Sequence, residues 1–239
     1  MRFLKLAFWN KVQFSVLLAG AIVAGGLWGF VELSEVARDT SAHAFDTRIL
    51  LMFRTPGDPD NPIGPLWVEE AMRDITALGS ASVLILITAG VVLYLLMAGR
   101  RSAALLVFVS VAGGQVLSSL LKLGIDRPRP ELVSHLAEVY TMSFPSGHAM
   151  LSAVTYLTLG ALLARIEKRR ATKIYVLSVA VLITVLVGAS RVYLGVHWPS
   201  DVLAGWCAGF AWAMLCWLAA NFLRQRGGLR EEPMSLDKE

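Results

Sequence analysis

The stretch Ser190–Asp201, SRVYLGVHWPSD, places an arginine, a histidine and an aspartate between two long apolar runs. Such a position is a membrane boundary, where ionisable side chains are expensive to place and are functional candidates by default. His197 precedes Asp201 by four residues, so the carboxylate can accept a hydrogen bond from one ring nitrogen and leave the other free and more basic. Arg191 can hold an anion beside this histidine. The stretch therefore favours a nucleophile or base next to an anion; a loop with a few capping charges is the alternative.

Two other segments carry side chains that suit the same anion. They are residues 122–130, KLGIDRPRP, and residues 144–148, FPSGH. Lys122, Arg129 and Arg191 together supply enough positive charge for a phosphate dianion, and each arginine presents a planar fork to phosphate oxygens. The three cations lie at ends of apolar runs that we expect to face the same side of a membrane.

The FPSGH segment also begins a predicted helix, because Pro145 and Gly147 stand just before an apolar run. The N–H groups of Ser146, Gly147 and His148 would have no partner within the helix and would point at the anion from its N-terminus. The hydroxyl of Ser146 adds one more donor. These groups and the cations predict a phosphate site.

Two histidines remain for the reaction itself. His197, oriented by Asp201, can attack phosphorus in line, and His148 can protonate the leaving oxygen. Cations that grip the phosphoryl oxygens stabilise charge in the transition state. This scheme needs no metal, because lysine and arginine supply the positive charge.

In order along the chain, the three segments contain K-x6-RP, PSGH and SR-x5-H-x3-D. This series of motifs resembles the three-part signature of the phosphatidic acid phosphatase type 2 superfamily. The resemblance covers residues 122–201 with no departure from the pattern, and three spaced motifs are far more specific than one short motif. The apolar runs around them also look like those of the integral-membrane lipid phosphatases of this group.

The resemblance implies an all-α, six-helix membrane bundle in which a phosphohistidine forms on His197 with support from Asp201. His148 would be the general acid for the leaving group and then the base that activates water. The resemblance also implies activity without a metal or another cofactor. The residues that it implies for phosphate binding are Lys122, Arg129, Ser146, Gly147 and Arg191.

Composition agrees with a polytopic membrane protein. Of the 239 residues, 56% are hydrophobic and only 17% are charged, and the mean hydropathy is +0.60. A soluble domain averages roughly 25% charged residues. A span needs about 20 apolar residues, so we expect one membrane domain over residues 1–239. The predicted spans are 13–31, 80–99, 102–121, 148–164, 174–189 and 202–223.

Short amphipathic helices are expected between the spans. Between the first and second spans, two patches favour helices in the membrane interface, with small packed loop helices as the alternative. The first patch is marked by Phe45, Ile49 and Phe53, and the second by Val68, Met72, Ile75 and Leu78. A third short helix is predicted from Leu132, Leu136 and Val139.

The distribution of charge predicts the orientation. Fourteen of the 22 Lys and Arg residues lie in the N-terminus, the turn at Arg100, the 165–173 turn and the tail from Arg224. By the positive-inside rule both termini face the cytoplasm and the motifs face outward. The net charge of +4 therefore reflects topology, and we expect no nucleic acid partner. No metal is predicted, since no Cys/His zinc spacing occurs.

Several residues have two interpretations. Arg127 could contact a headgroup or could be a solvated loop charge paired with Asp126 or Glu131. Trp198 could stack on a headgroup or could belong to an interface belt. The GxxxG pair of Gly25 and Gly29 suits either a homodimer seam or packing inside the bundle.

Gly205 and Gly209 form a second pair of small residues four positions apart. They are most simply explained by close helix packing.

We expect a lipid phosphatase of a bacterial inner membrane, with its site toward the periplasm or outside; an endomembrane with a lumenal site would show the same distribution of charge. The candidate substrates are phosphatidylglycerol phosphate, phosphatidic acid, diacylglycerol diphosphate, undecaprenyl diphosphate and a lipid A phosphate. A lipid phosphotransferase, in which an alcohol replaces water, would use the same site. A non-catalytic transporter or structural protein is a more distant alternative, because the apolar runs contain neither an internal repeat nor a mid-span charge.

Overall fold

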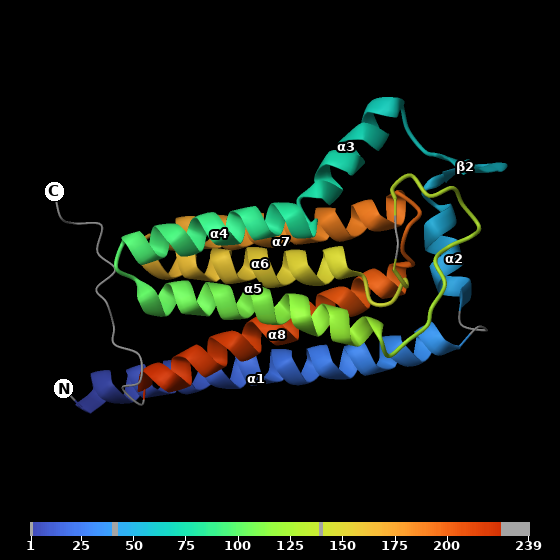
Figure 1. Ribbon diagram of the computed structural model, residues 1–239. Coiled ribbons are helices and arrows are strands. Elements are labelled where there is room, and N and C mark those ends of the chain that lie inside the picture. The colour runs from blue at the N-terminus through green and yellow to red at the C-terminus, as the bar shows by residue number, and fades with distance from the viewer. Residues whose placement is uncertain (1, 40–42, 139–140, 226–239) are drawn as a thin grey trace.

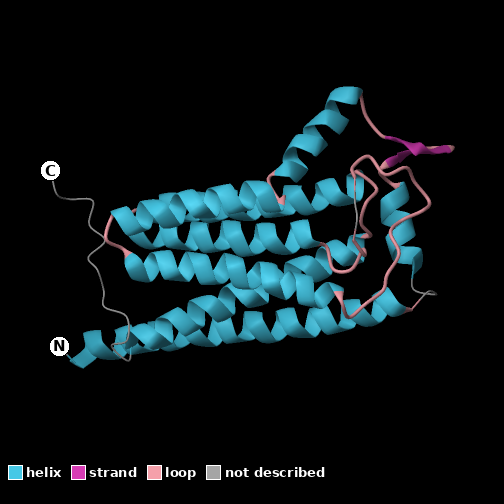
Figure 2. Cartoon of the chain, viewed as in Figure 1, coloured by secondary structure: helices cyan, strands magenta, loops and turns pink. Residues whose placement is uncertain are grey.

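The computed structural model of the chain describes residues 2–39, 43–138 and 141–225. In this described part, six long helices run side by side, and two shorter helices and a small hairpin lie at one end of the bundle (Figure 1). Figure 2 shows the same arrangement by secondary structure. The elements are α1 (Arg2–Arg38), α2 (His43–Leu51), β1 (Arg54–Thr55), β2 (Asp58–Pro62), α3 (Leu66–Ala77), α4 (Ala81–Met97), α5 (Arg101–Lys122), α6 (Gly147–Ile166), α7 (Arg170–Tyr193) and α8 (Pro199–Gln225).

Five of the described helices are long and apolar enough to cross a membrane, namely α1 from Val16 onward, α5, α6, α7 and α8. Helix α4 has 17 residues, and it qualifies only together with α3, from which it is bent by 48°. The predicted all-α membrane fold is therefore confirmed, with five spans, or six if the bent pair is one span. The span predicted at 174–189 belongs to a longer helix, α7, of 24 residues.

The break between α3 and α4 depends on Gly79. A Cβ atom at this position would lie 2.4 Å from Cγ1 of Val187 and 3.2 Å from the carbonyl oxygen of His148. Only glycine at position 79 lets the break between α3 and α4 contact α6 and α7 this closely. Helix α3 consequently leans away from the bundle above the end of α7 (Figure 1).

Helix α6 lies at the centre and packs against α5, α7 and α8, while α1 packs along α8. The contact between α6 and α8 is close because of two glycines. A Cβ at Gly205 would lie 2.6 Å from the carbonyl oxygen of Ser146, and one at Gly209 would lie 2.7 Å from that of Met150. The predicted close packing at this pair is confirmed, and it holds the first turns of the two helices together.

The two glycines of the other pair, Gly25 and Gly29, differ in their surroundings. A Cβ at Gly29 would lie 3.2 Å from Sγ of Cys207 on α8, whereas a Cβ at Gly25 would meet nothing within 4 Å. Gly29 thus packs inside the bundle and Gly25 does not.

The connections from α5 to α6 and from α7 to α8 lie at the same end of the bundle, next to α2 and the hairpin (Figure 1). The start of α1 and the end of α8 lie at the opposite end, together with the turns from α4 to α5 and from α6 to α7. The three motif segments therefore meet at one end, as expected from the alternation of spans.

The two short helices predicted between the first and second spans are confirmed as α2 and α3. Phe45, which marks the apolar face predicted for the first of them, is 53% exposed, as suits a helix in the membrane interface. Asp46 and Leu50 of the same helix are fully buried in the protein.

The short helix predicted near Leu132 is wrong for residues 131–138, which contain no helix; Val139 lies outside the described residues. This loop is held by tertiary hydrogen bonds instead. The N–H of Leu136 donates to the carbonyl of Leu194 over 3.0 Å, and Oγ of Ser134 donates to Oδ1 of Asp60, in the hairpin, over 2.7 Å.

The close contact between α6 and α8 predicts the effect of one methyl group. Gly209→Ala should lower the unfolding temperature in detergent, because overpacking a tight contact costs about 1–3 kcal/mol. Gly90→Ala is the matched control, since a Cβ there meets nothing within 4 Å, and it should leave the unfolding temperature unchanged or raise it. Equal unfolding temperatures for the two variants would contradict the packing described here.

Candidate active site

His197 lies in the connection between α7 and α8 and is 2% exposed. Its Nδ1 atom is 3.4 Å from Oδ2 of Asp201, and its Nε2 atom is 3.3 Å from Nη1 of Arg129. An imidazole beside a carboxylate carries its proton on the facing nitrogen. The ring therefore turns Nδ1–H toward Asp201 and the lone pair of Nε2 toward the cations.

The charge state of His197 follows from its burial. Loss of solvation, and to a smaller extent the charges of Arg191 and Arg129, lower the pKa of this imidazole from 6.5 to about 3 against the opposing effect of Asp201. His197 is consequently neutral at physiological pH. A neutral imidazole has the lone pair that a nucleophile requires.

Backbone geometry two residues earlier sets the position of this ring. Gly195 has a φ of +73°, which residues with a Cβ rarely adopt. A Cβ at Gly195 would also lie 2.7 Å from Nη2 of Arg54 and 2.8 Å from the carbonyl oxygen of Ser134. The connection can approach the hairpin and the 131–138 loop this closely only with glycine there.

Asp201 is fully buried in the first turn of α8, and both of its carboxylate oxygens have partners. Oδ2 accepts hydrogen bonds from Oγ of Ser143 and, over 3.0 Å, from the N–H of Trp198. Oδ1 accepts one from Nη1 of Arg127 over 2.6 Å. These bonds fix the carboxylate that faces His197.

Arg127 is a buried ion-pair residue, so its interpretation as a solvated loop charge is wrong. It is 2% exposed, and its Nη2 atom donates to Oδ2 of Asp46 over 2.7 Å while Nη1 bonds Asp201. Carboxylates that pair with a buried guanidinium offset the cost of removing it from water. Those carboxylates come from α2 and α8, whereas we expected Asp126 or Glu131.

Trp198 is 6% exposed, and its Nε1–H donates to the carbonyl of Pro128 over 3.1 Å. The guanidinium carbon of Arg127 lies 5.5 Å from the centre of its ring. Both side chains are buried within the protein. A contact of either one with a lipid headgroup stays a prediction.

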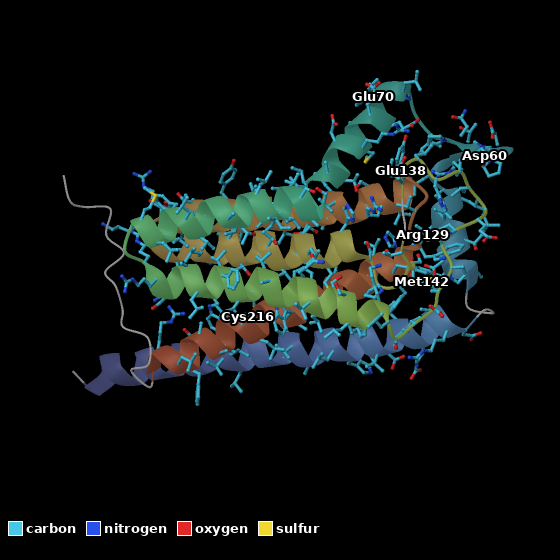
Figure 3. All side chains as sticks on the ribbon, viewed as in Figure 1. Asp60, Glu70, Arg129, Glu138, Met142 and Cys216 are labelled. Carbon is cyan, nitrogen blue, oxygen red and sulfur yellow. The ribbon has the colours of Figure 1, made fainter. Side chains whose placement is uncertain are left out.

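Three cations surround the space in front of His197. Lys122 donates to the carbonyl of Met142 over 2.9 Å, Nε of Arg129 donates to that of Thr141 over 2.8 Å, and Nη1 of Arg191 donates to Oγ1 of Thr76 over 3.0 Å. Within the described part of the chain, no carboxylate forms an ion pair with any of these three. Their positive charge is therefore available to an anion. Figure 3 shows Arg129 and Met142 at the end of the bundle near α2.

The start of α6 agrees with only part of the expected anion site. The N–H of Ser146 donates to the carbonyl of Asp201 over 3.0 Å, so this donor is not available as predicted. The hydroxyl of Ser146 is buried and has no partner in the protein. Gly147 and His148 occupy the first turn of α6, where N–H groups have no partner within the helix. The half-buried His148 ring lies near His197 and near the charges of Arg191, Lys122 and Arg129.

Four residues of this region had not been singled out in the sequence, namely Asp46, Thr76, Ser143 and Ser200. Each forms a hydrogen bond with a side chain of the three motif segments: Asp46 and Ser200 with Arg127, Thr76 with Arg191, and Ser143 with Asp201. Asp46 and Thr76 belong to α2 and α3, whose amphipathic pattern says nothing about partners on α7 and α8. Among the described residues, no group of three or more His, Cys, Asp and Glu side chains could hold a metal ion.

Comparison with known proteins finds a matching family and two related enzymes. The model of the PAP2 superfamily matches residues 103–225. Phosphatidylglycerophosphatase B of Bacillus subtilis is 35% identical over 150 residues, which are 60% of this chain and 70% of that protein. Undecaprenyl-diphosphatase of Sulfolobus acidocaldarius is 42% identical over 67 residues, which are 28% of each chain.

Two crystal structures share the fold. The first transmembrane PAP2 type phosphatidylglycerolphosphate phosphatase from Bacillus subtilis has a TM-score of 0.72 at 28% identity, and the match covers 85% of this chain and 96% of that one. Aquifex aeolicus LpxE has a TM-score of 0.56 at 24% identity over 73% of this chain and 95% of that one. The chain is accordingly an integral membrane protein.

The burial of Arg127 predicts a large effect on stability. Arg127→Gln should lower the free energy of unfolding by about 3–5 kcal/mol, because it leaves the carboxylates of Asp46 and Asp201 buried without their cation. Arg73→Gln is the control: Arg73 pairs with Glu69 over 2.6 Å but its side chain is 53% exposed. The free energy of unfolding of Arg73→Gln should fall by less than about 1 kcal/mol. Denaturant unfolding in detergent would measure both, and a similar loss in the two variants would contradict the buried network.

Proposed function

The chain belongs to the PAP2 superfamily, and from this premise we propose that it is a metal-independent membrane phosphatase that acts on a phosphate or diphosphate monoester of a lipid. One observation carries the proposal. A neutral imidazole, oriented by a buried carboxylate, turns its free nitrogen toward cations that have no carboxylate of their own. This arrangement suits attack on a phosphoryl group.

In the first step, Lys122, Arg129 and Arg191 bind the phosphoryl oxygens, together with the hydroxyl of Ser146 and the first-turn N–H groups of α6. Nε2 of His197 then attacks phosphorus in line with the bond to the lipid oxygen, and that bond breaks as the P–N bond forms. His148 gives its proton to the leaving oxygen.

The second step returns the enzyme to its starting state. His148, now neutral, takes a proton from water, and the resulting oxygen attacks phosphorus while the P–N bond to His197 breaks. The carboxylate of Asp201 stabilises the positive charge that the phosphorylated ring carries between the two steps. Inorganic phosphate leaves and His197 is neutral again.

The lipid part of the substrate would lie in an apolar groove of about 610 Å³ between α4, α5 and α6. The groove is lined at one end by Ala81, Leu84, Gln115 and Leu151, and Leu151 lies three residues after His148 in α6. A lipid tail in this groove would therefore bring its phosphate close to the level of His148. The names of the two related enzymes make phosphatidylglycerol phosphate and undecaprenyl diphosphate the first substrates to test.

The orientation that we propose follows the basic residues. The end of the bundle that holds the turns at Arg100 and at 165–173 would face the cytoplasm of a bacterium, and the candidate active site would face the periplasm. Substrate would then reach the site from the outer leaflet of the inner membrane.

Phosphate release by purified protein in detergent with EDTA tests the proposal. The panel contains the two lipids named above, phosphatidic acid, diacylglycerol diphosphate and a lipid A phosphate. Release from at least one lipid should persist in EDTA and be abolished in His197→Ala, since nothing else replaces the nucleophile. Release that stops in EDTA, or that survives in His197→Ala, would contradict the proposed chemistry. Release only on addition of an alcohol acceptor would identify a phosphotransferase instead.

A further inference from the structure

Asp46 is a buried carboxylate at the candidate site that belongs to none of the signature motifs. It lies in α2, outside the residues 103–225 matched by the family model. Its side chain is fully buried. It accepts hydrogen bonds from Nη2 of Arg127 over 2.7 Å and from the N–H and Oγ of Ser200 over 2.8 and 2.5 Å.

We propose that Asp46 is a positioning residue: it holds the Asp201 carboxylate in the orientation that keeps Nδ1 of His197 protonated and Nε2 free for attack. The proposal rests on the proposed function for the meaning of that attack. Asp46 acts on Asp201 by two routes, one through Arg127 and one through Ser200.

The first route depends on how Arg127 divides its donors. Arginine commonly binds a single carboxylate with two parallel N–H donors. Here Nη2 is engaged by Asp46, so Arg127 bonds Asp201 through Nη1 and Oδ1 alone. Oδ2 of Asp201, which accepts from Ser143 and from the N–H of Trp198, therefore has no bond from Arg127 and faces Nδ1 of His197, 3.4 Å away. Without the Asp46 carboxylate, Arg127 could turn both donors to Asp201 and compete with His197 for Oδ2.

The second route runs through the start of α8. Asp46 accepts the N–H of Ser200, the second residue of that helix, which has no acceptor within the helix. A carboxylate at a helix N-terminus is also favourable to the helix dipole. Asp46 thus links α2 to the first turn of α8, in which Asp201 directly follows Ser200.

Charge balance gives Asp46 a further effect. Arg127 faces two carboxylates, so its positive charge is compensated even when Asp201 is engaged with His197. When phosphorus binds Nε2, the His197 ring becomes positive and needs the negative charge of Asp201. Without the charge of Asp46, Arg127 would compete with the phosphorylated His197 ring for the negative charge of Asp201.

The kinetic test uses Asp46→Asn, which keeps the shape of the side chain and removes its charge. We expect kcat to fall by about tenfold to a hundredfold, because small misplacement of a reacting group has effects of this size. KM should stay near the wild-type value, since Lys122, Arg129 and Arg191 are untouched. Asp58→Asn, which changes an exposed carboxylate in β2, is the matched control and should keep the wild-type kcat.

A double variant tests the Arg127 route. Residues in one network are expected to be non-additive, so Asp46→Asn is also made in the Arg127→Gln background. If Asp46 acts in part through Arg127, the fall in kcat of the double variant should be smaller than the product of the two single effects. A kcat equal to the product of the two single effects would overturn the Arg127 route.

A measurement that needs no turnover separates this proposal from the proposed function. The chain has four histidines, so ring-¹⁵N NMR can identify His197 by the signal lost in His197→Gln. The wild type should show protonated Nδ1 and unprotonated Nε2, and Asp46→Asn should show a mixture of the two tautomers. If the tautomers behave in this way but the wild type releases no phosphate, the positioning role of Asp46 is supported and the proposed phosphatase function is rejected. Unchanged tautomer and unchanged kcat in folded Asp46→Asn would overturn the positioning role, and so would a raised KM with unchanged kcat.

Discussion

The guanidinium of Arg127 lies away from water at the end of a membrane bundle, where two carboxylates of the protein offset the cost of burying its charge. Its two carboxylate partners come from α2 and α8, so the ion pairs join the segment before the bundle's second span to the helix that carries Asp201. Removing Arg127 would leave both carboxylates buried without a cation. The position of α2, the start of α8 and the orientation of Asp201 therefore depend on one another.

The same region keeps two kinds of cation apart. Arg127 is neutralised by carboxylates, whereas Lys122, Arg129 and Arg191 are held by carbonyl and hydroxyl oxygens that carry no net charge. The first kind stabilises the architecture around His197, and the second kind leaves an excess of positive charge in front of Nε2. A dianionic phosphoryl group is attracted to the second kind alone. Burial of the histidine keeps it neutral in this positive surrounding, which is the state needed for attack.

Much of this was predictable from the sequence because its physical basis is local. Apolar runs of about 20 residues predict spans, and the motif spacing at 122–130, 144–148 and 190–201 predicts which side chains share one end of the bundle. Arg127 was misjudged because its partner Asp46 lies 81 residues away, and hydropathy patterns carry no information on such pairs. The pattern around Leu132 does not mark a helix: Leu136 packs a loop against Tyr193, Leu194 and Val196, whereas Leu132 is 49% exposed.

The central claim is that the phosphoryl group passes through Nε2 of His197. Its most direct test is a rapid-quench reaction with diacylglycerol diphosphate, whose leaving group is acidic enough to depart without help from His148. Mass spectrometry of the quenched protein, with ³¹P NMR to identify the ring nitrogen, would locate any bound phosphate. We expect phosphate on Nε2 of His197, and more of it in His148→Ala, where water is not activated. Turnover without protein-bound phosphate, or phosphate on another residue, would contradict the account.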